Sequence, residues 1–311
     1  MYIGVKDKLM TGQPVIAAGS WGSELVRRGV QPDPDLWTSP ANLEHPGTIG
    51  AITRDYALAG ADVVIANTYS TGPLLMAALE RSDEMRRLDT AAIRTAREAL
   101  SAIPNCKTAL AGSFNPRGAL PAGEKLLSAL SEKELMRLFA QKADILAAAG
   151  CDLIYMERLG GIERCLLGVE AAVATGLPVW VELAVERGAD GRLHGILPGH
   201  WPLDSMVDSL MSAGAQVCLV NHHDPVLMAE ALQTLKFTWA GPQGISLQNG
   251  NLDMPRWSHG GASPEDFAAD ARHLRVQGAR VFALNAGTGP EYVRALRETF
   301  HGHGAPGGEE G

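Results

Sequence analysis

Four polar side chains end four apolar runs, each seven residues after a glycine. The glycines are Gly60, Gly150, Gly214 and Gly278, and the polar residues are Asn67, Glu157, Asn221 and Asn285. Each glycine follows an amphipathic stretch, as expected for a left-handed residue that ends a helix. Each apolar run is typical of a strand buried on both faces. The common offset therefore predicts a polar ring at the carboxyl ends of parallel strands, where barrel enzymes place their chemistry.

Two carboxylates stand at these predicted strand ends. Glu157 ends the apolar run LIYME, and Glu182 interrupts VWVELAV in the following run. Because side chains alternate along a strand, Glu182 should point into the barrel mouth if Trp180 does. Two close carboxylates raise one pKa and give an acid–base pair, or else they hold a cation. The alternative is ordinary salt bridges, Glu157 with Arg158 or Arg164 and Glu182 with Arg187 or Arg192.

A histidine, His222, directly follows Asn221. Together with Glu157 and Glu182, an imidazole here would suit a divalent metal such as zinc, iron or manganese. It would equally suit a metal-free general base. A third interpretation is a loop histidine that caps the helix beginning near Asp224. We take Glu157, Glu182 and His222 as the candidate catalytic residues and also as the candidate metal ligands.

Neutral side chains at the same strand ends could bind a substrate by hydrogen bonds. They are Asn67, Asn221, Gln248, Asn249 and Asn285. Such a set suits an amino acid or a carboxylate. Trp21 and Tyr69 would form aromatic walls for a methylated sulfonium or ammonium donor through cation–π contacts. Each of these residues could instead serve the fold, the amides by bridging loops and the aromatics as core.

The order of the elements predicts one (β/α)₈ barrel over residues 1–300. Eight strands are expected at 14–19, 62–67, 107–113, 151–157, 177–183, 215–221, 243–249 and 279–285. Helices are expected at 90–102, 131–149, 161–175, 202–213, 224–235, 263–277 and 289–300. Ser131 with Glu134, and Ser263 with Asp266, resemble N-terminal capping pairs. Residues 184–201 are expected to form a long loop, a candidate lid, and 301–311 a disordered tail.

Composition excludes several classes of partner. The chain has 311 residues, 46% of them hydrophobic, and a net charge of −8. An acidic protein without a basic stripe repels nucleic acid. No run approaches the ~18 apolar residues of a membrane span, and no export signal is recognisable at the N-terminus. Four scattered cysteines indicate reduced thiols in a cytoplasmic protein. We expect a small-molecule substrate and leave a homo-oligomer open.

Several motifs, in order along the chain, resemble the homocysteine S-methyltransferase family. They are Gly19–Gly29, Leu36-Trp37, Ala59–Asp62 through Asn67-Thr68-Tyr69, Ala111-Gly112-Ser113, Met156–Leu159, Val220-Asn221-His222 and Gly287–Pro290. The resemblance runs from about residue 15 to residue 300. It implies a (β/α)₈ barrel that passes a methyl group from a sulfonium or ammonium donor to homocysteine. It also adds Ser113 to the substrate-binding candidates, and it implies that Glu157 binds the amino group of the acceptor.

The zinc site of this family has no counterpart in the chain. The family's zinc is held by three cysteines and turns the acceptor thiol into a bound thiolate, which is the nucleophile. The matching positions read His222, Asn285 and Ala286 here. Ala18 also stands where the family usually has an Asp that helps hold the amino acid. Other divalent metals stay open as cofactors.

Three functions follow from this comparison of residues. The first is a divergent methyltransferase acting on a small methylated sulfur or nitrogen metabolite, or on an amino-acid-like acceptor, without zinc–thiolate activation. The second is a metal-dependent hydrolase or lyase that uses Glu157, Glu182 and His222. The third is a non-catalytic small-molecule-binding protein, which the density of polar residues at the strand ends disfavours.

Overall fold

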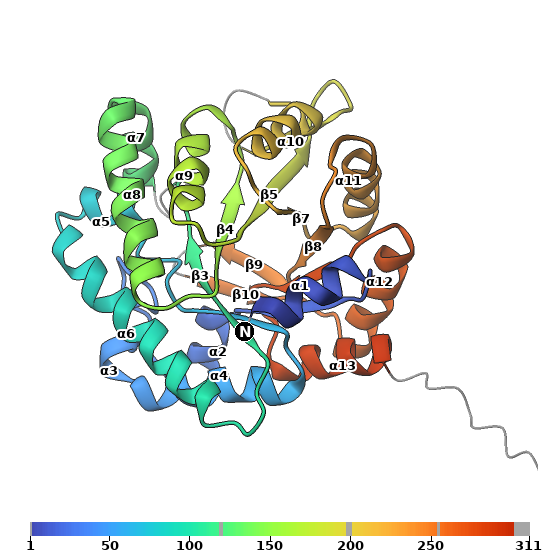
Figure 1. Cartoon of the computed structure of the whole chain (residues 1–311), viewed down its shortest axis with the longest axis horizontal. Coiled ribbons are helices and arrows are strands. Elements are labelled where there is room, and N and C mark those ends of the chain that lie inside the picture. Colours follow the sequence, from blue (N-terminus) through green and yellow to red (C-terminus); the bar gives the residue numbers. More distant parts are fainter. Residues whose placement is uncertain (1, 118–120, 197–200, 254–255, 302–311) are drawn as a thin grey trace, which may run out of the picture.

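The computed structural model describes residues 2–117, 121–196, 201–253 and 256–301. Eight parallel strands close into a barrel in which each pairs with the next along the chain (Figure 1). They are β1 (Val15–Ala18), β2 (Val63–Ile65), β3 (Ala109–Phe114), β4 (Leu153–Leu159), β5 (Val179–Arg187), β7 (Val217–Asn221), β8 (Gln243–Leu247) and β11 (Val281–Leu284). The pairing of β11 with β1 closes the ring. All eight expected strands are confirmed.

Helices surround this barrel (Figure 1). The main ones are α4 (Pro46–Ala59), α6 (Ser82–Ser101), α8 (Glu132–Ala148), α9 (Glu163–Ala174), α10 (Leu203–Ser212), α11 (Pro225–Thr238), α12 (Pro264–Val276) and α13 (Pro290–His301). The seven expected helices are confirmed, α6 beginning eight residues earlier than expected. The sequence reading did not specify α1 (Tyr2–Met10), α2 (Trp21–Arg27), α3 (Ala41–Glu44), α4, α5 (Pro73–Ala78) or α7 (Pro121–Ala129).

Local signals set several helix ends as expected. The glycines of the repeated pattern all have left-handed backbones, with φ of 106° at Gly60, 98° at Gly150, 93° at Gly214 and 117° at Gly278. A residue with a Cβ would be strained there, so glycine lets the chain turn from helix into strand. Ser131 and Ser263 both form complete capping boxes.

Two apolar layers hold the barrel together. One fills its interior and includes Ala111, Tyr155, Trp180, Leu219 and Ala283. The other lies between the strands and the surrounding helices. Helix α1 covers the amino-terminal end of the barrel, since Val5 joins the interior layer and the Trp180 Nε1 donates to the Tyr2 hydroxyl at 3.1 Å. Helix α1 therefore closes the amino-terminal end of the barrel interior.

The expected long loop at 184–201 is wrong in its first part. Strand β5 continues to Arg187 and returns as the antiparallel strand β6 (Leu193–Gly195). The apolar residues of this segment, Val185 and Leu193, are buried and favour a hairpin over a loop. Residues 197–200 and the expected tail at 302–311 lie outside the described residues. A second hairpin pairs β9 (Gly250–Asp253) with β10 (Arg256–His259).

None of the helices in the described ranges is both long enough and apolar enough to cross a membrane.

Candidate functional site

The carboxyl ends of six strands bring polar side chains together at one level of the barrel interior. Each lies two residues after an interior apolar or glycine residue, so it points the same way. The polar residues are Ser113, Glu157, Glu182, Asn221, Ser246 and Asn285, from β3, β4, β5, β7, β8 and the end of β11. Of the four residues of the predicted ring, Glu157, Asn221 and Asn285 belong to this set, together with the candidates Ser113 and Glu182.

Glu157 and Glu182 form the chemical centre of this ring. The Ser113 hydroxyl donates to Glu157 Oε1, and the Tyr155 hydroxyl donates to Glu182 Oε2 at 2.7 Å. Glu182 is completely buried. Its second oxygen, Oε1, has no hydrogen-bond partner among the described residues. Neither carboxylate forms a salt bridge within the described ranges, so the salt bridges considered above are absent there.

The surroundings keep a proton on this acid pair at neutral pH. Burial and the negative charge of Glu182 raise the pKa of Glu157 to about 8. Burial also raises the pKa of Glu182, although the nearby Ser246 and Tyr155 hydroxyls and the Arg158 backbone N–H favour its charged form. Two like charges so close cannot both persist without a cation. The pair is suited to receive a cationic group or to exchange a proton.

Arg158 reaches the same mouth by an irregular backbone. Its φ is +56°, and the pairing of β4 with β5 shifts register between Met156 and Leu159. The Arg158 Nη1 donates to Asn221 Oδ1 at 3.5 Å, and Arg117 Nη1 donates to the Arg158 carbonyl at 3.4 Å. A guanidinium therefore borders the acid pair.

The remaining amide candidates are bonded to the protein itself. Asn67 Nδ2 donates to the Thr38 carbonyl at 3.0 Å and to Asn42 Oδ1 at 2.9 Å. Asn249 Nδ2 donates to the Ala262 carbonyl at 2.8 Å and to the Tyr292 hydroxyl at 2.7 Å. Both side chains are buried. These contacts fit the role of loop bridges that shape the mouth.

Asn221 and Asn285 both meet Ser246 in the ring. Asn221 Nδ2 lies 3.2 Å from Ser246 Oγ, and Asn285 Nδ2 lies 3.5 Å from the same oxygen. Asn285 Oδ1 accepts from the Ala286 N–H at 2.8 Å. Asn285 is half-buried, so its amide is reachable from the mouth.

The two aromatic candidates have different surroundings. Trp21 is buried, donates its Nε1–H to the Ile65 carbonyl and packs edge-on against Tyr56. Tyr69 is half-buried. Burial raises the pKa of Tyr69, and the charges of Arg158 and Glu157 also act on it. Tyr69 is therefore within electrostatic range of Arg158 and Glu157, while Trp21 packs as core.

His222 does not join the two carboxylates. Its Nδ1 accepts from the Asp224 N–H at 3.0 Å, and its ring stacks on His223. Burial and the neighbouring His223 lower the pKa of His222. No three His, Cys, Asp or Glu side chains are grouped to hold a metal ion in the part of the chain that is described. The trio Glu157, Glu182 and His222 is thus not assembled as a ligand set.

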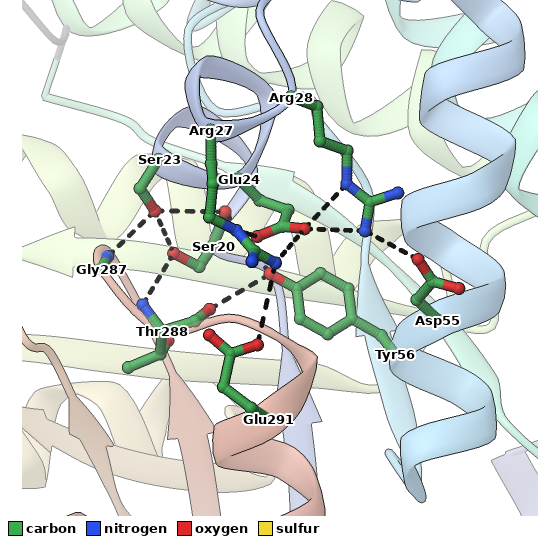
Figure 2. A network of polar contacts seen from close by, with 10 residues as sticks. All are labelled: Ser20, Ser23, Glu24, Arg27, Arg28, Asp55, Tyr56, Gly287, Thr288 and Glu291. Carbon is green, nitrogen blue, oxygen red and sulfur yellow. Dashed lines mark hydrogen bonds and ion pairs between the residues drawn. The ribbon is translucent and has the colours of Figure 1, made fainter. Parts of the chain in front are cut away.

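A polar network fixes the loop that carries Asn285 and Ala286 (Figure 2). The Gly287 N–H donates to Ser23 Oγ at 3.0 Å, and the Thr288 N–H donates to Ser20 Oγ at 3.4 Å. The Tyr56 hydroxyl donates to the Thr288 carbonyl at 3.2 Å. These bonds tie the end of β11 to the start of α2 and to α4, where the barrel closes.

The buried Glu24 anchors the other half of this network. It accepts from Arg27 and Arg28, with three N···O contacts of 2.8 Å. Arg28 also binds Asp55 on α4 at 2.7 Å. Figure 2 shows these side chains converging from α2 and α4, with Glu291 of α13 3.7 Å from Arg27. The segment from Ser20 to Arg28 therefore binds both the loop after β11 and helix α4, and it fixes that loop at the carboxyl end of the barrel.

Three residues of the site, Tyr155, Ser246 and Arg158, were not predicted as site residues from the sequence. Tyr155 and Ser246 each lie two residues before a polar residue already singled out, Glu157 and Gln248, so the two-residue period could have found them. Arg158 was considered only as a salt-bridge partner. Its left-handed backbone has no signal in the sequence.

A surface hollow lies at the opposite end of the barrel, away from the acid pair. Its walls include Tyr2, Lys6, Gln216, Gln243 and Arg280, from α1 and the amino-terminal ends of strands. Since barrel chemistry belongs to the carboxyl ends, this hollow is not the candidate site.

Comparison with known proteins gives one consistent relationship. A sequence model described as homocysteine S-methyltransferase matches residues 15–300. Betaine–homocysteine S-methyltransferase 1 of Pongo abelii is 26% identical, over 95% of this chain and 74% of that protein. S-methylmethionine–homocysteine S-methyltransferase BHMT2 of Mus musculus is 26% identical, over 95% of this chain and 80% of that protein.

Among solved structures, the metallated homocysteine methyltransferase MmuM of Escherichia coli superimposes with a TM-score of 0.76. The two share 22% identity over 95% of this chain and 98% of that one. This structural likeness supports the (β/α)₈ fold.

Proposed function

The chain belongs to the homocysteine S-methyltransferase family, and from that premise we propose that it methylates a small amino-acid-like acceptor without zinc–thiolate activation. The donor is a methylated sulfonium or ammonium compound. The observation that carries the proposal is Glu157, a carboxylate on an interior strand end of a barrel whose relatives are methyltransferases. Its role is to hold the acceptor's amino group.

The contacts of Glu157 do not offset the cost of its negative charge, so a cationic ligand would stabilise its ionised form. Oε1 accepts from Ser113, but burial and the adjacent Glu182 still disfavour its charge and raise its pKa. An ammonium group supplies both a counter-charge and hydrogen bonds, so binding is coupled to ionisation of Glu157. Asn285, half-buried beside Ser246, supplies a further polar contact.

The residues at the family's zinc positions do not fit that metal. Zinc sites of this type need thiolates, and these positions read His222, Asn285 and Ala286. His222 Nδ1 and Asn285 Oδ1 already accept backbone N–H groups at 3.0 and 2.8 Å, and Ala286 has no donor atom. We therefore route no step through zinc.

Methyl transfer in such a mouth relies on alignment and on exclusion of water. The acceptor atom attacks the methyl carbon in line, the bond from carbon to the donor sulfur or nitrogen breaks, and its electron pair stays with the donor. The proton of the acceptor passes to solvent. Holding both reactants in line removes much of the entropic cost of the encounter. Loss of water favours a step that removes positive charge from the donor.

The test is an assay with isotopically labelled donors. We would incubate the protein with L-homocysteine and trideuteromethyl betaine or S-methylmethionine, with a zinc chelator present, and detect labelled L-methionine by mass spectrometry. We expect transfer from one donor, and loss of transfer in Glu157→Gln. Absence of transfer from both donors, or transfer abolished by the chelator, would contradict the proposal. Binding of L-methionine without transfer would favour a binding protein.

A further inference from the structure

We propose that Arg158 binds the carboxylate of an α-amino acid whose ammonium group lies at Glu157. The inference rests on the proposed function and narrows its acceptor to an amino-acid zwitterion. Two neighbouring residues of β4 would then recognise the two charged groups of one ligand.

Regular strand geometry places Glu157 and Arg158 on opposite faces. Since Tyr155 belongs to the interior layer, Glu157 points inward and Arg158 should point toward the helices. The Arg158 guanidinium instead meets Asn221, whose side chain lies in the interior ring, at 3.5 Å. The left-handed φ of +56° and the register shift before Leu159 produce this departure. The side chains of both Glu157 and Arg158 are therefore directed toward the carboxyl end of the barrel interior.

Nearby groups stabilise this unfavourable backbone. A non-glycine residue with positive φ is strained and persists where its surroundings fix it. Arg117 Nη1 donates to the Arg158 carbonyl at 3.4 Å and fixes one end of this peptide unit. The backbone N–H and the guanidinium of Arg158 both lower the pKa of Glu182, against the larger effect of burial.

The Arg158 guanidinium retains most of its hydrogen-bonding capacity. It has five N–H donors, and within the described ranges the acceptor that it contacts is the Asn221 amide oxygen, at a long 3.5 Å. It makes no ion pair within 4.0 Å with Glu157 or Glu182 among the residues described. Its charge still acts on both carboxylates.

Opposite charges held apart in one mouth match a zwitterion. A direct Glu157–Arg158 salt bridge would have neutralised both groups and left nothing for a ligand. Because the Glu157 carboxylate and the Arg158 guanidinium are not paired with each other, an α-amino acid can bind its ammonium group to Glu157 and its carboxylate to Arg158. Arginine suits the second contact because its planar donors bind a carboxylate in pairs.

The experiment is calorimetric titration with two probes, L-methionine and 3-(methylthio)propylamine, which lacks only the carboxylate. The wild-type protein should bind L-methionine more tightly. Arg158→Met should weaken L-methionine binding by about 10- to 100-fold, the value of a charge-assisted contact, and change amine binding by a much smaller factor at pH 9, where Glu157 is mostly ionised. Arg158→Lys should keep an intermediate preference.

A second variant guards against misfolding. Arg158→Gly removes the guanidinium and accepts the positive φ without strain, so it should reproduce the loss seen in Arg158→Met. Equal binding of the two probes by the wild type, or undiminished L-methionine binding in Arg158→Gly, would overturn the inference. If methyl transfer and its loss in Glu157→Gln remain in that case, the proposed function stands. If the binding experiment and the methyl-transfer assay both fail, the inference about Arg158 and the proposed function are both wrong.

Discussion

Glu157 and Glu182 lie on neighbouring strands of the barrel, two residues after Tyr155 and Trp180 of its interior layer. Tyr155 pairs with Trp180, and the register of the two strands then shifts between Met156 and Leu159, where Glu157 lies. A separate hydroxyl group binds each carboxylate, Ser113 for Glu157 and Tyr155 for Glu182. Glu182 is completely buried and Glu157 is half-buried, and burial together with the charge of Glu182 raises the pKa of Glu157, so their protonation becomes the property of the pair.

Ligand binding at Glu157 should depend on pH. With its pKa raised to about 8, Glu157 is mostly protonated at pH 6 and must ionise to pair with an ammonium group. Affinity for 3-(methylthio)propylamine should therefore rise by several-fold per pH unit from pH 6 to 8. Titrations in buffers of different ionisation enthalpy should reveal proton release near pH 7. Affinity that is flat over this range in the wild type, or equally steep in Glu157→Gln, would refute this.

Removing the negative charge of Glu182 should shift the pH dependence of amine binding. The negative charge of Glu182 is the second-largest cause of the raised pKa of Glu157, after burial. Glu182→Gln should thus shift the midpoint of the binding profile to lower pH. Tyr155→Phe is the matched control, since it removes the hydroxyl bonded to Glu182 and retains the Glu182 carboxyl group. An unchanged midpoint in Glu182→Gln would show that the acids are not coupled.

The same carboxylate should make folding stability pH-dependent. Its pKa is raised from 4.5 to about 8 in the folded state, so its contribution is complete below about pH 4.5 and is lost as pH rises through 8. Glutamine imitates the protonated acid, so Glu157→Gln should be more stable than the wild type at pH 9 by more than about 1 kcal/mol. Urea unfolding at pH 5 and pH 9 measures this, and the difference should shrink at pH 5.

Periodicity and glycine placement predicted the barrel and most of its ring. The glycine-to-polar offset located Asn67, Glu157, Asn221 and Asn285 at strand ends because helix termination and strand length are local properties. Alternation along β5 placed Glu182 correctly from Trp180. The hairpin at β5 and β6 was read as a loop because its glycines and charges outnumber its buried residues.

Contacts between distant segments could not be predicted in the same way. Asn67 lies at the predicted strand end, but its amide is taken by Thr38 and Asn42. His222 Nδ1 accepts from the Asp224 N–H, and its ring stacks on His223, contacts that the sequence pattern did not predict. Arg158 has a positive φ, and its carbonyl accepts from Arg117, which is remote in the chain. Such features follow from packing rather than from local pattern.

A buried ion pair supports the segment that carries Asn67 and Tyr69. Lys142 and Asp89 are both completely buried and 2.7 Å apart, and Lys142 Nζ also donates to the Thr68 carbonyl at 3.0 Å and to Thr71 Oγ1 at 2.9 Å. Lys142→Met leaves Asp89 unpaired and should cost about 3–5 kcal/mol of unfolding free energy. Arg94→Met, which breaks an exposed pair with Glu98, should cost less than about 1 kcal/mol. Similar losses in both variants, by urea unfolding, would contradict the argument.

Restoring one thiolate should not restore a zinc site. His222→Cys returns a cysteine to the position that the family uses, but a structural or catalytic zinc needs at least three protein ligands. Asn285 and Ala286 still provide no thiolate, and the buried Cys151, Cys165 and Cys218 lie elsewhere in the fold. Burial also raises the pKa of Cys151 to about 12, which disfavours its thiolate form.

The measurement is elemental analysis by plasma mass spectrometry after dialysis against dilute zinc. We expect less than about 0.1 zinc per chain in His222→Cys, since a single thiolate binds zinc weakly. The variant His222→Cys/Asn285→Cys/Ala286→Cys supplies all three sulfurs and tests whether the backbone still holds the family geometry. One zinc per chain in the single variant, with none in the wild type, would mean that ligands near His222 complete the site. Glu157 and Glu182 would then act beside a metal centre and would not substitute for it.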